Sequence, residues 1–218
     1  DCDGKGDATE GCLALDPELR LDAPGGALGE ASGGAAHSYD VQLARGTTSV
    51  YAVWSQLVGS VTEVYLRRSV DGGVTWGTIV NVTAGVTATA VKPAIAVAPG
   101  APDRVVVAFQ TVAGGVRDIQ VAVSADGGAT FGAASGVLDA AGDSFHHAVA
   151  IRGATCVVTW EKLDTATLNR DIISRASTDG CATFGAERKI NVGSPATRFA
   201  GRPQVGITST GGVVWAWR

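Results

Sequence analysis

The sequence predicts an all-β fold: a β-propeller of four-stranded antiparallel blades, with about three and a half to four blades in these 218 residues. One observation is a phrase that occurs three times, at Ser69–Gly77, Ser124–Gly132 and Ser177–Gly185. Its spacing of about 53 to 55 residues is typical of repeat architectures. The other is that each repeat holds four short, alternating segments rich in β-branched residues, which matches one propeller blade.

Aligning the repeats on this phrase predicts each strand in order. First strands are expected at 40–43, 93–97, 147–151 and 203–207; second strands at 50–54, 105–109, 156–160 and 213–217; third strands at 63–67, 118–122 and 171–175; fourth strands at 78–82, 135–138 and 188–192. One additional fourth-type strand, at 19–22, opens the domain. The first strands would line a central channel. The aromatic residues that close the second strands would fill the space between blades.

This order gives three whole blades and three strands of a fourth, which favours a piece of a larger propeller over a closed four-bladed ring. A β-sandwich is the alternative architecture, but it does not explain a four-strand period. The domain division we expect is an acidic loop at 1–14 followed by propeller blades at 15–218. The absence of Met indicates a processed product or a fragment.

Composition limits the classes of partner and the compartment. The net charge is −4 and no basic stripe with interleaved aromatic residues occurs, so nucleic acid is not expected. No apolar run approaches the ~20 residues of a membrane span. The four cysteines predict two disulfides, Cys2–Cys12 and Cys156–Cys181, and hence a secreted or cell-surface protein. Zinc is the alternative, but no C-x-x-C pair is present.

The repeated phrase has a physical rationale. Its Ser and Asp oxygens can accept backbone N–H bonds within a tight turn, and its Gly supplies positive φ. It resembles the Asp-box of sialidase-like (BNR repeat) β-propellers, S-x-D-x-G-x-x-W/F. That resemblance implies a structural role on the face away from the sialidase active site. The residues that match are Ser69, Asp71, Gly73, Trp76, Ser124, Asp126, Gly128, Phe131, Ser177, Asp179 and Phe184.

The first ten residues contain alternating acids. They resemble the calcium-binding repeat of thrombospondin type 3, D-x-D-G-x-G-D-x-x-D. The resemblance implies that the carboxylates and one backbone carbonyl bind Ca²⁺, a cation that takes six to eight oxygen ligands. The expected ligands are Asp1, Asp3, Asp7, Glu10 and the carbonyl of Lys5. A solvated acidic terminus is the alternative.

The propeller face opposite the Asp-boxes is the expected ligand-binding face. Lys92, His146, Arg198 and Arg202 are its candidate ligand-binding residues, and Glu161 and Asp164 are among its other polar residues. His146 and His147 are not expected to bind one metal together, because adjacent strand residues point to opposite sides.

The sialidase resemblance also gives a test of catalysis. That family places an Arg that clamps the substrate carboxylate at the start of an inner strand. Aligned on Pro, the equivalent positions here are His37, Val91, Phe145 and Gly201, none of which is Arg. No catalytic residue is therefore assigned.

The function we expect is a secreted, non-catalytic, sialidase-like propeller module for extracellular binding, adhesion or architecture. Its partners would be a glycan or an extracellular protein, with further blades or another copy of the chain completing the ring. The alternative is a fragment of a glycoside hydrolase, a sialidase-like exo-glycosidase.

Overall fold

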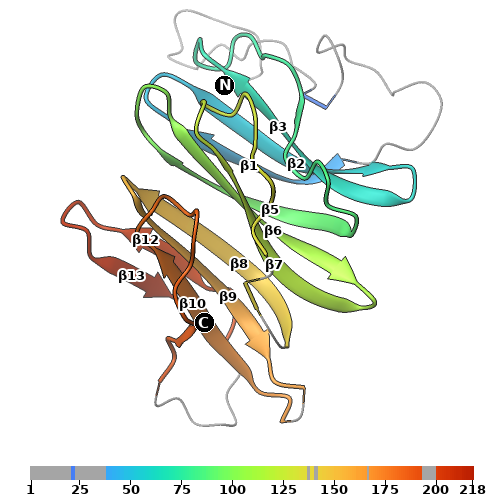
Figure 1. Cartoon of the computed structure of the whole chain (residues 1–218), viewed down its shortest axis with the longest axis vertical. Coiled ribbons are helices and arrows are strands. Elements are labelled where there is room, and N and C mark those ends of the chain that lie inside the picture. The colour runs from blue at the N-terminus through green and yellow to red at the C-terminus, as the bar shows by residue number, and fades with distance from the viewer. Residues whose placement is uncertain (1–20, 23–37, 137, 140–141, 166, 193–199) are drawn as a thin grey trace, which may run out of the picture.

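The computed structural model describes residues 21–22, 38–136, 138–139, 142–165, 167–192 and 200–218. Within these ranges the secondary structure consists of β-strands joined by turns, and no helix occurs. There is accordingly no candidate membrane-spanning helix among them. The strands form four separate antiparallel sheets that succeed one another along the chain (Figure 1). The predicted all-β, blade-like architecture is confirmed.

The strands fall into four groups, which we call blades 1 to 4. Blade 1 is β1 (Ser38–Arg45), β2 (Val50–Val58), β3 (Val61–Ser69) and β4 (Val80–Asn81); blade 2 is β5 (Thr89–Ala98), β6 (Arg104–Ala113) and β7 (Val116–Ser124); blade 3 is β8 (Asp143–Arg152), β9 (Thr155–Leu163), β10 (Arg170–Ser177) and β11 (Arg188–Lys189); blade 4 is β12 (Gln204–Ile207) and β13 (Val213–Ala216). Each sheet keeps sequence order, so every connection within a sheet joins neighbouring antiparallel strands.

The fourth strands are shorter than predicted. β4 and β11 contain two residues each, and the described residues of the segment expected at 135–138 are not in a strand. Ser135 and Leu138 nevertheless donate backbone hydrogen bonds to β7, so this segment follows the edge of blade 2 without forming a ladder. Gly136, and the Gly132-Ala133-Ala134 run just before this segment, offer little side chain to pack on a strand edge. Of the strand predicted at 19–22, only Leu21 and Asp22 are described, and they form a bend.

The core lies between successive blades. Tyr51, Val53 and Leu66 of blade 1 pack against Val107 and Phe109 of blade 2. A second cluster joins blades 2 and 3 and contains the fully buried Trp160. Burying such side chains stabilises each by roughly 1.5–3 kcal/mol, so adjacent blades stabilise one another. Of the aromatic residues that close the second strands, Trp54, Phe109 and Trp160 are buried as predicted, whereas Trp217 is 42% exposed.

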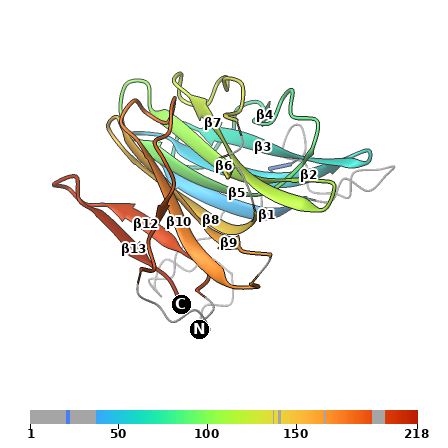
Figure 2. The same ribbon diagram turned by 60° about the horizontal axis from the view of Figure 1, so that its bottom comes forward.

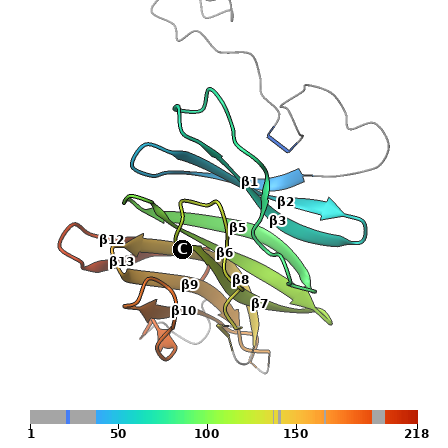
Figure 3. The same ribbon diagram turned by 45° about the horizontal axis from the view of Figure 1, so that its top comes forward.

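The first strands of successive blades lie side by side, as predicted for strands that line a channel. β1 contacts β5, β5 contacts β8, and β8 contacts β12. Figures 2 and 3 show this succession from two further directions, with β5 between β1 and β8. The start of each first strand therefore meets the start of the next.

The three repeated phrases, which we call Asp-boxes for the motif that they resemble, form closely similar turns after β3, β7 and β10. In blade 1 the Ser69 hydroxyl accepts the Gly73 N–H at 2.8 Å and donates to Asp71, which accepts the Thr75 N–H. The same bonds recur in blades 2 and 3. The aromatic residues Trp76, Phe131 and Phe184 are half-buried rather than fully buried. These bonds are local, which supports the structural role that the phrase predicts.

The disulfide between Cys156 and Cys181 is confirmed, with Cα atoms 5.4 Å apart. Cys156 lies opposite Ser177, the first residue of the third Asp-box, so the bond ties the second strand of blade 3 to its Asp-box turn. Cys181 stands where the other boxes have Gly and keeps a φ of 70°. The predicted pair of Cys2 and Cys12 lies outside the described residues, as do the calcium ligands predicted at Asp1, Asp3, Lys5, Asp7 and Glu10.

Candidate functional site

The first strands β1, β5 and β8 are each interrupted by a β-bulge at the same place. The register shifts between Tyr39 and Gln42 in β1, between Val91 and Ala94 in β5, and between Phe145 and Ala148 in β8. In each case two residues oppose one aromatic residue of the second strand. In blade 4, reciprocal hydrogen bonds between Gly201 and Arg218 place the same arrangement opposite Trp217.

The first residue of every bulge has a positive φ although it is not glycine. We call these four the bulge residues; they are Asp40 at 56°, Lys92 at 54°, His146 at 41° and Arg202 at 51°. This conformation costs roughly 1–2 kcal/mol for a residue with a Cβ. Bulges and strained backbone both concentrate where a protein aims side chains at a ligand. Four such residues at equivalent positions of the blades indicate a candidate functional site.

The bulge residues lie at the end of the blades opposite the Asp-boxes. The turns of the second and third boxes hydrogen-bond to the β5–β6 and β8–β9 connections through Gly127 N–H to Asp103 and Gly180 N–H to Ala154. Those connections follow the far ends of the first strands, whereas the bulges come near their beginnings. The Asp-box turns and the bulge residues therefore lie at opposite ends of the first strands.

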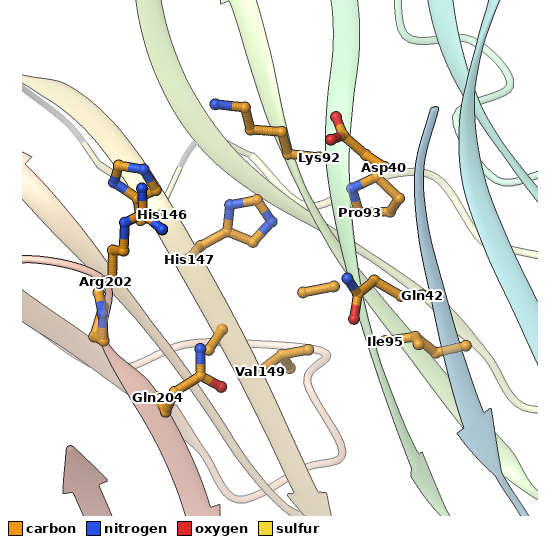
Figure 4. Close-up of a pocket in the computed structure, with 13 residues that line it drawn as sticks. Asp40, Gln42, Lys92, Pro93, Ile95, His146, His147, Val149, Arg202 and Gln204 are labelled. Carbon is orange, nitrogen blue, oxygen red and sulfur yellow. The ribbon is translucent and has the colours of Figure 1, made fainter. Parts of the chain in front are cut away.

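The bulge residues line one cavity of about 520 Å³, which we call the mouth cavity. Its volume falls within the ~300–1,000 Å³ of ordinary ligand sites. The polar side chains come from all four blades, and aliphatic residues of β5 and β8 form the rest of the wall (Figure 4). The lining residues are Asp40, Gln42, Lys92, Pro93, Ala94, Ile95, His146, His147, Ala148, Val149, Arg202, Pro203 and Gln204.

Side chains of the preceding blade hold two of the bulges in place. The Lys92 N–H donates to the Ser55 hydroxyl at 3.1 Å, and the Arg202 N–H donates to Glu161 Oε2 at 3.3 Å. Ser55 and Glu161 occupy equivalent positions, because each opposes the residue before its own blade's bulge. The same kind of hydrogen bond, from a bulge-residue N–H to a side chain of the preceding blade, therefore links blade 1 to blade 2 and blade 3 to blade 4.

Glu161 is the most connected side chain near the mouth cavity. It is 1% exposed, accepts from His146 Nδ1 at 3.0 Å and pairs with Arg170 through its other oxygen. Gly201 leaves room for it, because a Cβ there would lie 2.9 Å from Glu161 Oε2. This buried carboxylate thereby positions both His146 and the backbone of Arg202.

His146 and His147 line the same cavity, which corrects the prediction that adjacent residues would point apart. The positive φ of His146 breaks strand alternation at the bulge. The Nε2 of His147 lies 3.2 Å from the carbonyl of Ala108. Burial lowers the pKa of His147 to about 4, so its ring is neutral at neutral pH. No group of three potential metal ligands occurs among the described residues.

Two cations of the mouth cavity have no ion-pair partner in the described part of the chain. They are Lys92 and Arg202, both bulge residues. Neighbouring cations are paired: Arg117 contacts Asp143 at 2.6 Å, and Arg170 contacts Glu161. Asp40 is the one bulge residue that carries a carboxylate. The cavity therefore combines two unpaired cations, one acid and two amide side chains.

The structure brings together three of the four predicted ligand-binding residues, Lys92, His146 and Arg202, whereas Arg198 lies outside the described residues. The bulge register aligns Tyr39, not His37, with Val91, Phe145 and Gly201. The clamp position in blade 1 was therefore wrong by two residues, because no Pro marks that bulge. None of the corrected positions is Arg.

Sequence reasoning missed Asp40 as a site residue and did not assign Glu161 a role. Asp40 could have been found by aligning it with Lys92 and Arg202. Each of those two residues is followed by Pro, whereas Asp40 is followed by Val41, so the alignment was not evident. Glu161 was placed on this face only as one of its polar residues.

No family model matches this chain, and no curated protein sequence matches it. Solved structures do resemble it in fold. An α-L-arabinanase of Penicillium chrysogenum, complexed with arabinobiose, has a TM-score of 0.61 at 17% identity, over 80% of this chain and 55% of that chain. The α-L-arabinofuranosidase Arb93A of Fusarium graminearum has a TM-score of 0.60 at 14% identity, over 81% and 55%.

A protein of unknown function from Dyadobacter fermentans has a TM-score of 0.54 at 19% identity, over 75% of this chain and 44% of that chain. The chain thus spans about half the length of these structures. At such identities the similarity establishes the fold, and these neighbours support its assignment as a β-propeller.

Proposed function

We propose that this chain is the carbohydrate-binding part of a glycoside-hydrolase-type β-propeller, with the mouth cavity as its saccharide site. The observation that carries the proposal is the convergence of four strained bulge residues, one from each blade, on that cavity. Repeated strain at equivalent positions is tolerated only where the surrounding structure enforces it, and such positions cluster at ligand sites.

The chemistry of the cavity suits a sugar. Lys92, Arg202, Gln42 and Gln204 offer donors, and Asp40 offers acceptors, so hydroxyl groups can bond in both directions. The aliphatic wall from Ile95 and Val149 suits the C–H surface of a sugar ring. The folds named above include an arabinanase and an arabinofuranosidase, which makes a saccharide the first ligand class to test.

Hydrolysis is a second candidate function, and Asp40 is the observation that favours it. Most glycoside hydrolases use two carboxyl groups, about 5–9.5 Å apart, on either side of the scissile bond. Asp40 is the carboxylate that lines the mouth cavity, while Glu161 is engaged by Arg170, His146 and the Arg202 N–H. A binding role therefore uses the described residues as they stand, whereas hydrolysis requires a second acid in addition.

The Cys156–Cys181 disulfide supports a secreted protein, because such bonds persist in oxidising compartments. The Asp-box turns support kinship with sialidase-like propellers, but without Arg at the clamp positions we expect no cleavage of sialosides. The calcium loop at residues 1–12 stays a prediction.

Titration calorimetry with a panel of oligosaccharides tests the binding function. We expect at least one arabino-, galacto- or uronic-acid-containing oligosaccharide to bind, and binding to weaken in His146→Ala. Thr210→Ala, at the other end of the first strands, is the matched control and should bind as the unaltered chain does. A panel that shows no binding would overturn the proposal.

A separate assay addresses hydrolysis. The purified chain is incubated with arabino-oligosaccharides and with 4-nitrophenyl α-L-arabinofuranoside, and products are followed by chromatography and absorbance. Product formation that is lost in Asp40→Asn would establish the second candidate. Binding without turnover would leave the binding role as the function of this chain.

A further inference from the structure

We infer that the saccharide bound in the mouth cavity carries an anionic group, a carboxylate or a sulfate ester, held between Lys92 and Arg202. This inference rests on the proposed function and names the ligand class more narrowly. It starts from two charges that nothing in the described part of the chain neutralises. An uncharged saccharide would leave both positive charges without a counter-charge.

The two cations share one cavity but come from different blades. Lys92 begins the bulge of β5 and Arg202 the bulge before β12, and both line the mouth cavity. In the view of Figure 4 the ends of both side chains turn toward His146, while Asp40 lies on the far side of Lys92 beside Pro93. The cavity thus has a cationic side formed by blades 2 to 4 and an acidic side formed by blade 1.

Lys92 and Arg202 lack a carboxylate partner among the described residues, whereas other cations near the mouth cavity have one. Arg117 and Arg170 lie near the mouth, and each has a carboxylate: Asp143 for Arg117 and Glu161 for Arg170. Glu161 accepts the Arg202 backbone N–H, but its carboxylate pairs with Arg170 and not with the Arg202 side chain. The arrangement therefore leaves the Arg202 guanidinium available, although an acid lies next to its own backbone.

The backbone under both cations is fixed before any ligand arrives. The Lys92 N–H bonds to Ser55 and the Arg202 N–H bonds to Glu161, and both residues hold positive φ. Fixing these side chains at their Cα atoms lowers the ordering cost of binding. Charge-assisted bonds from Lys and Arg to a carboxylate or sulfate are roughly twice as strong as neutral hydrogen bonds.

His147 does not compete for the anion. Burial lowers its pKa to about 4, and the neutral ring lies with Nε2 near the Ala108 carbonyl. The anion-holding positions also differ from the clamp positions discussed above, which are Tyr39, Val91, Phe145 and Gly201 in the corrected register. The charge here belongs to the next residue along each strand.

The test compares three ligands that differ in charge: an oligogalactoside, the corresponding oligogalacturonide and a sulfated oligogalactoside. Calorimetry at low and at physiological salt gives each affinity for the unaltered chain, Lys92→Gln, Arg202→Gln and the control Arg152→Gln. Arg152 is an exposed residue at the far end of β8. Thermal unfolding checks that every variant is folded, and Lys92→Gly provides a variant that removes the charge while relieving backbone strain.

We expect at least one acidic ligand to bind ten times or more tighter than the neutral one, with affinity falling as salt rises. Lys92→Gln and Arg202→Gln should each weaken acidic-ligand binding by about ten- to a hundredfold. They should weaken neutral-ligand binding much less, because Gln keeps a hydrogen-bond donor but removes the charge. Arg152→Gln should change neither. The preferred acidic ligand identifies carboxylate or sulfate as the source of the charge.

Equal affinity for neutral and acidic ligands would overturn the inference while leaving the proposed function intact. Binding of none of the three ligands, nor of any oligosaccharide in the wider panel, would overturn both.

Discussion

The Nδ1 atom of His146 lies 3.0 Å from Oε2 of the buried carboxylate of Glu161. A carboxylate oxygen only accepts hydrogen bonds, so Nδ1 must carry the proton. In the neutral ring Nε2 is then an acceptor. The same Oε2 atom accepts the Arg202 N–H. One side chain therefore fixes the tautomer of one bulge residue and the backbone of the next.

Replacing Glu161 tests this coupling. Glu161→Gln leaves Arg170 without its charged partner, and we expect the free energy of unfolding to fall by about 1–3 kcal/mol. The ¹⁵N chemical shifts of His146 should change from an Nδ1–H pattern to a mixture of tautomers, because an amide can either donate or accept. Glu63→Gln, which alters an acid bonded to Tyr65 in blade 1, should leave the His146 spectrum unchanged. An unaltered tautomer in Glu161→Gln would contradict the assigned role.

Because Lys92 has a positive φ, we expect glycine to be more stable than alanine at this position, which is the reverse of the usual order in a strand. Lys92→Gly should be more stable than Lys92→Ala by about 1 kcal/mol, because only the Cβ-bearing residue is strained at a φ of 54°. Urea unfolding measures the difference. At Arg152 in the same comparison, Ala should be the more stable residue, since glycine in a strand loses more backbone entropy. A Gly variant of Lys92 less stable than its Ala variant would refute the strain argument.

The Cys156–Cys181 disulfide should contribute roughly 3 kcal/mol, because it closes a loop with a sequence separation of 25 residues. We expect Cys156→Ala/Cys181→Ala to lose about this amount in urea unfolding. Cys156→Ala/Cys181→Gly should lose less, because glycine suits the φ of 70° at position 181, as it does at Gly73 and Gly128. Equal losses in the two double variants would show that turn strain at this position is negligible.

The Asp-boxes predict how stability responds to acid. Hydrogen bonds from Thr75, and then from Ser69, lower the pKa of Asp71 to about 2, and Asp126 has a pKa of about 2 for the equivalent reasons. The ordinary value is 3.8. Because the folded-state pKa is the lower one, the stabilisation is complete above about pH 4 and is lost as the pH falls toward 2.

Carboxyl ¹³C titration and unfolding at several pH values check this prediction. Asp71→Asn should remove part of the acid-dependent loss of stability. A titration midpoint for Asp71 near its ordinary value would contradict the hydrogen-bonding account.

The fold could be predicted from the sequence because its signals are local and repeated. The three Asp-boxes indicate the length of the repeat. The alternation of apolar and polar residues predicts the first three strands of a blade. The fourth strands were less predictable, because pairing at a blade edge depends on contacts that short segments rich in Ala and Gly do not secure. Residues 132–136, which do not form a strand, are an example.

The site was predictable only in part. Lys92, His146 and Arg202 were identified from their place in the repeat, but their left-handed backbone was not, because the residues that adopt it are not glycines. Asp40 was missed for the same reason, since neither a Gly nor a Pro marks the bulge of β1. The role of Glu161 depends on a contact across two blades, which periodicity cannot reveal.

Chemical-shift mapping tests the central claim most directly. A ¹⁵N-labelled sample of the chain is titrated with the tightest-binding oligosaccharide of the panel, and backbone amide shifts are followed. We predict that the largest changes occur at Asp40, Lys92, His146 and Arg202, with the Asp-box residues Asp71, Asp126 and Asp179 unaffected. Changes centred on the Asp-box turns, or spread evenly over both ends of the blades, would contradict a saccharide site at the mouth cavity.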